Sequence, residues 1–387
     1  MATPFANFQN EIYLRGTTGE RPPFTTDLAG LEEAARGVLS AEAFGYVAGA
    51  AGSGATARAN RAAFDRLRIV PRLLRDVSER DLSVTLFGQA LPAPVLLGPV
   101  GVQTIVHPDG ELASARAAAS TGLVYVHSTA AAHSIEDVAA ASGAGPRWYQ
   151  LYWPSERDVA ASLVARAEAA GYSALVVTLD TFVLGWRPTD LDAAYLPFLT
   201  GTGIANYLTD PAFNAPLGED APLGDKVFRW AGLFGNPALT WDDLAWLRER
   251  TGLPIVLKGV LHPDDARAAA DAGAAGVIVS NHGGRQVDGA VAALDALPGV
   301  VAAAGDDLAV LFDSGVRTGA DVIKALALGA AAVLIGRPYV YGLGLGGQAG
   351  VEHVLRCLLA DLDVTLALSG HRRPADLTPD VVRPLTL

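Results

Sequence analysis

Cysteine, lysine and long apolar runs are scarce in this sequence of 387 residues. Its one cysteine, Cys357, excludes an intrachain disulfide. Lysine occurs only at Lys226, Lys258 and Lys324 although arginine is abundant, so a lysine at a functional position calls for a chemical explanation. The uncharged stretch 117–135 contains glycine, serine, threonine and two histidines. This composition suits a helix end, a buried strand and a loop better than a membrane span.

Basic residues are also outnumbered, and the formal net charge is -12. Because binding to nucleic acid requires clustered lysine and arginine, we expect no nucleic-acid partner, and any anionic ligand must be held by local arginines. The first residues, MATPFANFQNEIY, lack the basic stretch and apolar core of a secretory signal. The sequence therefore indicates a cytoplasmic protein with no membrane partner.

From about residue 90, short apolar runs alternate with alanine-rich helical patterns. Parallel strands covered by helices have this appearance, and eight repeats predict a closed (β/α)8 TIM barrel, in the α/β class. The eight runs begin at Val95, Leu123, Trp148, Ala174, Pro254, Gly276, Leu308 and Ala332.

The length and the 50% hydrophobic content suit one large core, so we expect a single domain over residues 1–387. Within it we expect an N-terminal helical cap over 1–90, the barrel over 91–360 and a C-terminal tail over 361–387. The fourth and fifth runs start 80 residues apart, whereas other neighbours start 22 to 32 residues apart. The insertion that results, 187–240, is either a lid over the barrel mouth or a surface excursion that includes a subunit contact.

Polar residues follow the strands at the end where a barrel gathers them into one mouth. The sixth strand ends in SNHGGRQ, which places Ser280, His282 and Arg285 in one loop. An isolated histidine is usually structural, but one beside glycines and three residues before an arginine favours a catalytic base. Asp180, after the fourth strand, either caps the following segment or orients this imidazole.

Other candidates lie at neighbouring strand ends. Gln150 and Tyr152 belong to the third strand, Arg187 follows the fourth, and Lys258 ends the fifth. Tyr46 lies in GYVAGAAG, where the glycines most simply end a helix. Both tyrosines are functional only if they reach the mouth, and otherwise they contribute to packing.

Two glycine-containing turns, FDSGVRTG and IGRP, follow the seventh and eighth strands. Each precedes a helix and contains an arginine, Arg317 or Arg337. Backbone amides at a helix start together with arginine hold phosphate, and this end of a barrel is its commonest phosphate site. The alternative is that both are ordinary turns.

Together these motifs resemble the FMN-dependent 2-hydroxy-acid oxidase family over nearly the whole chain. The matching segments are SNHGGRQ from Ser280, LKGV from Leu257, WYQLY from Trp148, VTLDT from Val177, FDSGVRTGADVIKALALGA from Phe312 and IGRP from Ile335. The resemblance implies bound FMN, oxidation of a small L-2-hydroxy acid, dioxygen as a second reactant, no metal, and a homo-oligomer.

The resemblance also implies a role for each matching residue. The flavin ring would contact Pro99, Val100, Gly101, Ser128, Gln150, Thr178, Lys258 and Ser280, and Asp313 would take the ribityl hydroxyls. The phosphate would lie on Gly315, Arg317, Gly336 and Arg337. Substrate would meet Tyr46, Tyr152, Arg187 and Arg285, with His282 as base, Asp180 as its partner and Lys258 stabilising charge on the flavin. Whether the base takes a proton from the hydroxyl or from the carbon stays open.

Within the family, the lactate 2-monooxygenases look most similar, through FQNEIYLRGTTG, GWRPTDLDAAYLPFL and the long insertion. This likeness implies oxidative decarboxylation of a lactate-like acid, and release of 2-oxo acid and hydrogen peroxide is the alternative. Ala130 stands where relatives often have a bulky residue, which implies a wider pocket. Gly101 stands where many have alanine, which implies space beside the flavin. A Schiff-base lyase using Lys258 and a non-catalytic flavin-binding protein are further alternatives.

Overall fold

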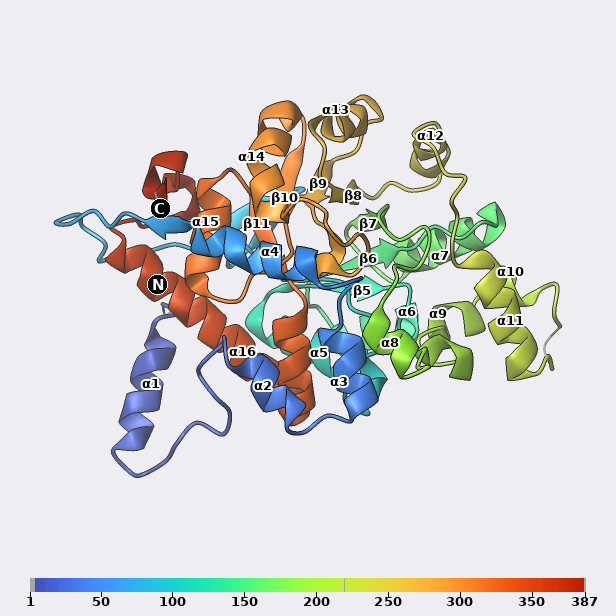
Figure 1. Ribbon diagram of the computed structural model, residues 1–387, viewed down its shortest axis with the longest axis horizontal. Coiled ribbons are helices and arrows are strands. Elements are labelled where there is room, and N and C mark those ends of the chain that lie inside the picture. Colours follow the sequence, from blue (N-terminus) through green and yellow to red (C-terminus); the bar gives the residue numbers. More distant parts are fainter. Residues whose placement is uncertain (1–3, 219, 386–387) are drawn as a thin grey trace.

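Eight parallel strands at the centre of the molecule close into a barrel (Figure 1). The computed structural model describes residues 4–218 and 220–385. The strands are β4 (Val95–Leu97), β5 (Val124–Ser128), β6 (Arg147–Leu151), β7 (Leu175–Thr178), β8 (Ile255–Val260), β9 (Gly276–Val279), β10 (Ala309–Phe312) and β11 (Ala332–Ile335). Each overlaps one predicted apolar run, and β9 pairs with β10 as β11 pairs with β4. The predicted TIM barrel is confirmed.

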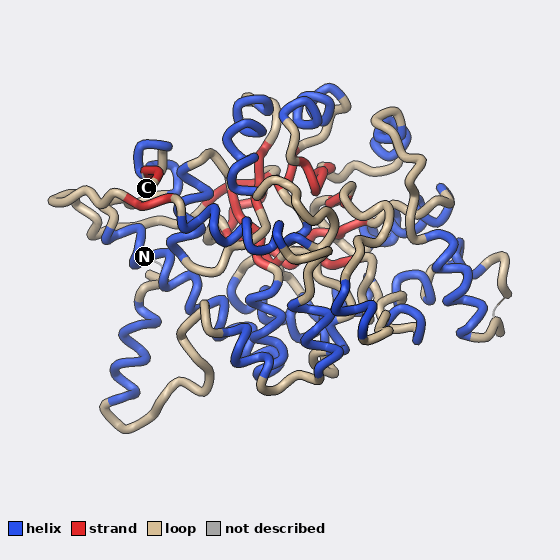
Figure 2. The backbone as a smooth tube through the Cα atoms, viewed as in Figure 1, coloured by secondary structure: helices blue, strands red, loops and turns tan. Residues whose placement is uncertain are grey.

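Helices surround the barrel, so that the strands lie at the centre of the backbone trace (Figure 2). These helices are α5 (Gly110–Thr121), α6 (Ile135–Ser142), α7 (Arg157–Ala169), α12 (Asp243–Arg248), α13 (Pro263–Asp271), α14 (Ala293–Ala304), α15 (Gly319–Ala327) and α16 (Arg337–Leu368). Alternate strand residues pack in opposite directions: Val95 and Leu97 join the core under the helices, while Leu96 joins the barrel interior. Because both faces are buried, the strands are continuously apolar.

The N-terminal segment contains helices, as expected, but also strands that the sequence prediction missed. The helices are α1 (Asn7–Gly16), α2 (Leu31–Arg36), α3 (Ala41–Ala48) and α4 (Ala55–Asp65). β1 (Leu67–Ile69) pairs with β12 (Val382–Pro384), and β2 (Val84–Leu86) forms a hairpin with β3 (Gln89–Leu91). Leu86 and Leu91 join the barrel-interior cluster, and the Phe87 ring lies 5.5 Å from that of Trp148. The hairpin therefore fills the end of the barrel opposite the polar strand ends.

The last helix also differs from its expected boundary. α16 runs to Leu368, past residue 360, where the sequence analysis ended the barrel. The reason is that Leu362 and Leu366 continue the buried apolar stripe of the helix beyond that residue.

The insertion after β7 is folded and attached to the barrel wall. It contains α8 (Pro188–Asp192), η2 (Pro197–Thr200), α9 (Ala205–Leu208), α10 (Pro211–Asn214) and α11 (Leu223–Leu233), the last two at the right edge of Figure 1. Asn206 Nδ2 donates to the carbonyls of Ser128 at 3.1 Å and Thr129 at 3.0 Å. Arg166 of α7 pairs with the buried Asp210 at 3.1 Å. These contacts fix α9 and α10 against the barrel and α7.

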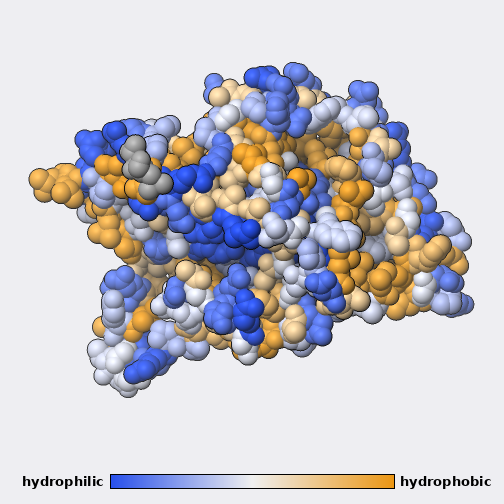
Figure 3. Space-filling view, in the orientation of Figure 1, coloured by the Kyte–Doolittle hydropathy of each residue, from blue (hydrophilic) through white to orange (hydrophobic). Residues whose placement is uncertain are grey.

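The molecular surface exposes apolar residues mainly in loops. The loop between β1 and β2 exposes Leu73 and Leu74 and forms the left tip of the molecule, which is apolar in Figure 3. Within residues 4–218 and 220–385, no helix is both long and apolar enough to cross a membrane. The same residues contain no cluster of histidine, cysteine, aspartate or glutamate suited to a metal ion.

Candidate functional site

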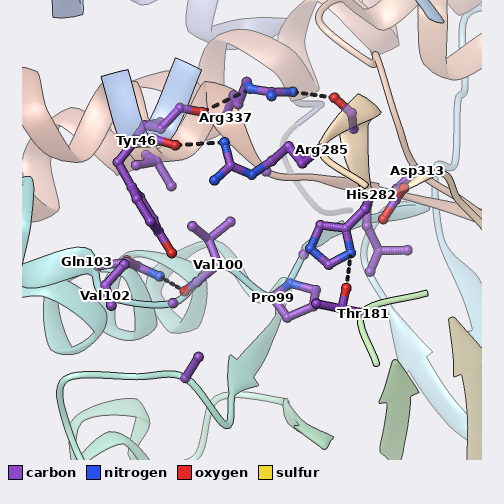
Figure 4. Close-up of a pocket in the computed structure, with 18 of the residues that line it drawn as sticks. Tyr46, Pro99, Val100, Val102, Gln103, Thr181, His282, Arg285, Asp313 and Arg337 are labelled. Carbon is purple, nitrogen blue, oxygen red and sulfur yellow. Dashed lines mark hydrogen bonds between the residues drawn. The ribbon is translucent and has the colours of Figure 1, made fainter. Parts of the chain in front are cut away.

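The carboxyl ends of the barrel strands open into one cavity, shown in Figure 4. Most residues predicted from the sequence line it: Tyr46, Pro99, Val100, Gly101, Tyr152, Arg187, Lys258, His282, Arg285, Asp313, Gly315, Arg317, Gly336 and Arg337. The other predicted residues, Ser128, Gln150, Thr178, Asp180 and Ser280, are not part of that lining and lie behind it. The barrel therefore brings together side chains from most of its strand ends, as expected for this fold.

His282 occupies a tight turn directly after β9. Its φ of 58° lies in the left-handed region, which costs a residue other than glycine about 1–3 kcal/mol. The turn is held by Ser314 Oγ, which accepts from Gly283 N at 3.0 Å, and by Asn281 Oδ1, which accepts from Gly284 N at 3.1 Å. Strain compensated by neighbouring bonds at a cavity wall is typical of a functional position.

The imidazole of His282 is oriented by a carboxylate. Its Nδ1 lies 2.9 Å from Asp180 Oδ1 and 3.1 Å from Thr181 Oγ1, while Nε2 lies 3.5 Å from the Tyr152 hydroxyl. Burial lowers the pKa of His282, and the Asp180 charge offsets part of this. Burial opposes ionisation of Asp180, but the charges of His282 and Lys258 outweigh it and lower its pKa to about 2. A neutral imidazole that donates Nδ1–H to Asp180 leaves the Nε2 lone pair facing Tyr152 and the cavity.

Two arginines converge on the same cavity without a carboxylate partner in the described residues. Arg285 Nη1 donates to the carbonyls of Tyr46 at 2.7 Å and Gly49 at 2.8 Å, and its guanidinium lies 5.2 Å from the Tyr46 ring centre. Burial and the charge of Arg187 lower the pKa of Arg285 to about 10. Burial also raises the pKa of Tyr46, and it raises that of Tyr152 to about 12, so both hydroxyls stay protonated. An anion with acceptor oxygens would relieve the repulsion between the two cations.

Lys258 is buried and charged. Its Nζ donates to Ser280 Oγ at 2.9 Å and lies 3.3 Å from Asp313 Oδ2. Burial opposes the charge on Lys258, but Asp313 and Asp180 outweigh it and raise its pKa. A Schiff-base lysine must lose its proton to attack a carbonyl. The raised pKa therefore counts against a lyase that uses Lys258.

The turns after β10 and β11 form a second cationic region. Burial and the charge of Arg337 lower the pKa of Arg317 to about 10. Among the described residues, its side chain donates only to the Val316 carbonyl, at 3.0 Å. Arg337 instead braces the backbone through the carbonyls of Val47, Gly49 and Gly283. A buried guanidinium with unused donors beside glycine turns suits a terminal phosphate.

Behind the cavity, two buried polar groups lack a partner. Thr178 Oγ1 and Gln150 Nε2 make no hydrogen bond within residues 4–218 and 220–385, although Gln150 Oε1 accepts from Ser128 Oγ at 2.9 Å. Leaving such groups unpaired costs about 1–3 kcal/mol each unless a ligand satisfies them. A planar ring edged with carbonyl and N–H groups would do so, since Thr178 and Gln150 are the predicted ring contacts. Together with the phosphate region, these residues fit FMN.

The structure explains the presence of glycine at position 101 differently from the sequence analysis. A Cβ at this residue would lie 2.3 Å from the carbonyl oxygen of Ala130. That oxygen also accepts a hydrogen bond from Val102 N at 2.9 Å. The backbone of Ala130 therefore fills the place expected for a missing methyl, and Gly101 is required by close approach of two loops rather than providing space beside the flavin.

Several residues around the site were missed in the sequence analysis. Gln286 Oε1 accepts from Arg187 Nη2 at 2.8 Å, and Glu111, fully buried, accepts from Gln103 N at 3.0 Å and Ala132 N at 3.1 Å. Gln286 lies in the SNHGGRQ motif and could have been chosen from it. Glu111 belongs to an ordinary helical pattern, so nothing in the sequence distinguished it. Phe198 and Phe234 of the insertion region also line the cavity.

Comparisons with known proteins agree with this site. Residues 35–384 match the family described as FMN-dependent dehydrogenase. The chain is 48% identical over 386 residues to the FMN-dependent alpha-hydroxy acid dehydrogenase qulF of Penicillium citrinum, covering 98% of this chain and 96% of that protein. It is 45% identical over 360 residues to an L-lactate oxidase of Lysinibacillus sphaericus, covering 93% of each.

A comparison with solved structures supports the same family. The crystal structure of mandelate oxidase matches with a TM-score of 0.83 and 39% sequence identity, covering 94% of this chain and 99% of that one. The barrel, the cavity and these relatives all agree with the resemblance found in the sequence. The chain belongs to the FMN-dependent dehydrogenase family and is an FMN-dependent 2-hydroxy-acid oxidoreductase.

Proposed function

We propose that this protein oxidises an L-2-hydroxy acid somewhat larger than lactate to the 2-oxo acid and passes the electrons to dioxygen. The observation that supports this most strongly is that His282 Nε2 shares one cavity with two arginines that have no carboxylate partner in the part of the chain that the structure describes. His282 can take a proton, and the two arginines can hold an anion. A 2-hydroxy acid offers both a proton and a carboxylate.

Each protein group then has a distinct task. Arg187 and Arg285 hold the substrate carboxylate, and the hydroxyls of Tyr46 and Tyr152 donate to substrate oxygens. His282 Nε2 accepts one proton, and the Asp180 carboxylate stabilises the imidazolium that forms. When bound, FMN accepts the two electrons that the substrate loses and delivers them to dioxygen.

The fixed charge of Lys258 supports the same step. Since the substrate gives up two electrons, negative charge develops on the acceptor side of the cavity. Lys258 is held in place by Ser280 and Asp313, so it stabilises this charge without reorganising. The proposed role also explains why a lysine stands here in a chain whose basic residues are mostly arginine.

The apolar side of the cavity supports a substrate side chain larger than methyl. Val102, Val106, Ala130, Phe198 and Phe234 line it. Ala130 presents only a methyl group there, which leaves the room that a bulkier residue would fill. Burial of each added methylene group contributes about 0.8 kcal/mol to binding. We therefore expect kcat/KM to rise from lactate to branched or aromatic 2-hydroxy acids.

We infer that the products are 2-oxo acid and hydrogen peroxide. The relatives named above include oxidases for lactate and mandelate, and Gly101 no longer supports decarboxylation. Oxidative decarboxylation is the second candidate, in which retained 2-oxo acid and peroxide give a carboxylic acid one carbon shorter, carbon dioxide and water. The insertion favours this candidate, because Phe198 of η2 walls the cavity and would slow product release.

Product analysis in air tests the proposal. Purified protein is incubated with lactate, 2-hydroxyisocaproate and mandelate, and 2-oxo acid, peroxide, shortened acid and carbon dioxide are measured. One peroxide per 2-oxo acid supports the oxidase. Shortened acid in excess establishes the second candidate. Flavin that substrate reduces but air does not reoxidise would show that another electron acceptor is used.

A further inference from the structure

A second cavity lies beside the first, on the other side of Tyr152. It has a volume of about 430 Å³ and shares Tyr152, Thr181 and Phe234 with the main cavity. Its outer part is formed by the exposed Phe182 and Trp241. It extends inward to the buried strand ends of β6 and β7, so it connects the surface with the neighbourhood of the site by a separate route.

The two cavities differ in charge. Arginine, lysine, histidine and aspartate side chains line the main cavity. The second contains none of these: its lining consists of Tyr152, Trp153, Thr178, Leu179, Thr181, Phe182, Phe234, Asn236, Pro237, Leu239, Thr240, Trp241 and Leu244. A carboxylate without a cation is unstable in such surroundings, which excludes a second hydroxy-acid site. The lining suits a small neutral molecule of low polarity.

The wall between the cavities restricts what can cross it. The rings of Tyr152 and Phe234 pack with their centres 5.1 Å apart. The Tyr152 hydroxyl is within 3.5 Å of His282 Nε2, which holds this residue toward the site. A substrate side chain would have to separate the two rings, whereas a diatomic molecule passes during ordinary side-chain fluctuation.

We propose that this second cavity is a binding and access site for dioxygen. The proposal rests on the proposed use of dioxygen as electron acceptor. Dioxygen is apolar and small, and it has to reach the cofactor position through the protein. Thr178, a predicted flavin contact, lines the second cavity but not the first. The second cavity therefore reaches one predicted flavin contact that the main cavity does not.

Filling the cavity tests this assignment. Leu239 is half-buried, lines the second cavity only, and lies outside the catalytic and cofactor groups. Leu239→Trp would occupy much of the space, and Leu239→Ala would enlarge it. Leu199→Trp is the matched control, because Leu199 is exposed, belongs to the same insertion and lines neither cavity. Each holoenzyme is reduced anaerobically with substrate and mixed with buffers of known oxygen content.

The rate constants of the two half-reactions decide the result. We expect Leu239→Trp to slow reoxidation by dioxygen about fivefold or more, with flavin reduction by substrate within twofold of the unmodified protein. Leu239→Ala and Leu199→Trp should reoxidise at least as fast as the unmodified protein. Equal reoxidation rates in Leu239→Trp and Leu199→Trp would overturn the dioxygen route. Slow reoxidation of the unmodified protein itself would instead overturn the proposed oxidase function.

Discussion

Gln286 ties Arg187 to the loop that orients the catalytic base. Its Oε1 accepts from Arg187 Nη2 at 2.8 Å, and its Nε2 donates to the carbonyls of Asp180 at 2.8 Å and Val183 at 2.9 Å. One amide side chain thus sets the position of a carboxylate-binding cation relative to the base. Gln286 itself does not line the cavity.

Replacing Gln286 tests this positioning role. Gln286→Met keeps the length of the side chain but removes these three bonds and a fourth, from Gly185 N at 3.2 Å. Arg187 then keeps only its bond to the Arg285 carbonyl among the described residues, so its orientation is loosened. We expect KM for the hydroxy acid to rise about tenfold with a smaller change in kcat, since such bonds contribute about 1.5–3 kcal/mol. Steady-state kinetics at saturating oxygen measure both constants.

The control is Gln348→Met, because the Gln348 side chain bonds, within the described residues, only to Arg116 and Glu352 on the outer helices. Its KM should stay unchanged. If Gln286→Met alters kcat and KM equally, or if both variants behave alike, the positioning role is wrong.

The pH dependence of flavin reduction follows from the His282–Asp180 pair. His282 acts as a base only when neutral, and burial lowers its pKa below the ordinary value for histidine. The rate should therefore be constant above this pKa and fall as pH drops through it. In Asp180→Asn the charge that raises the pKa of His282 is lost, so the acid limb should move to lower pH. The plateau should also fall about 10²–10⁴-fold, because the imidazolium is no longer stabilised.

Anaerobic stopped-flow reduction from pH 5 to 9 measures both effects. His282→Gln should retain FMN, lose reduction and show no acid limb. An acid limb at the same pH in Asp180→Asn and in the unmodified protein would falsify the assignment of that limb to His282.

Arg317 should matter for cofactor retention. Arg317→Met removes a buried cation that has unused donors, and we expect FMN to dissociate about 10-fold to 100-fold more readily. Released flavin is measured by fluorescence after dilution. Arg116→Met, which alters an arginine on the outer surface of α5, is the control and should retain FMN normally. Normal FMN retention by Arg317→Met would place the phosphate elsewhere.

The barrel could be predicted because each strand is buried on both faces and therefore appears as an apolar run between helical patterns. The β2–β3 hairpin could not, since each of its strands has three residues and only Leu86 and Leu91 are fully buried. Its position depends on contacts with Trp148 far along the chain. Short segments whose conformation is set by distant partners leave little local signal.

In the site, too, residues placed by the local fold could be predicted, whereas residues placed by distant contacts could not. His282 and Arg285 follow β9, and Lys258 lies in β8 near its carboxyl end, so the fold alone directs them to one mouth. Glu111 acts through two backbone amides from separate loops, a relationship that no spacing in the sequence reveals. Gly101 is the instructive error, because the absence of a side chain was interpreted as free space while the neighbouring backbone occupies it.

Gly101→Ala distinguishes these two interpretations. If the missing methyl left space beside the flavin, alanine would fill it and shift products toward free peroxide. The structure instead places the new Cβ 2.3 Å from the Ala130 carbonyl, so the two loops must separate. We expect a loss of about 1–3 kcal/mol in the free energy of unfolding and weaker FMN retention, with an unchanged ratio of peroxide to 2-oxo acid. Gly232→Ala, on α11 with open space around it, should lose neither stability nor FMN. A stable Gly101→Ala protein with an altered product ratio would restore the first interpretation.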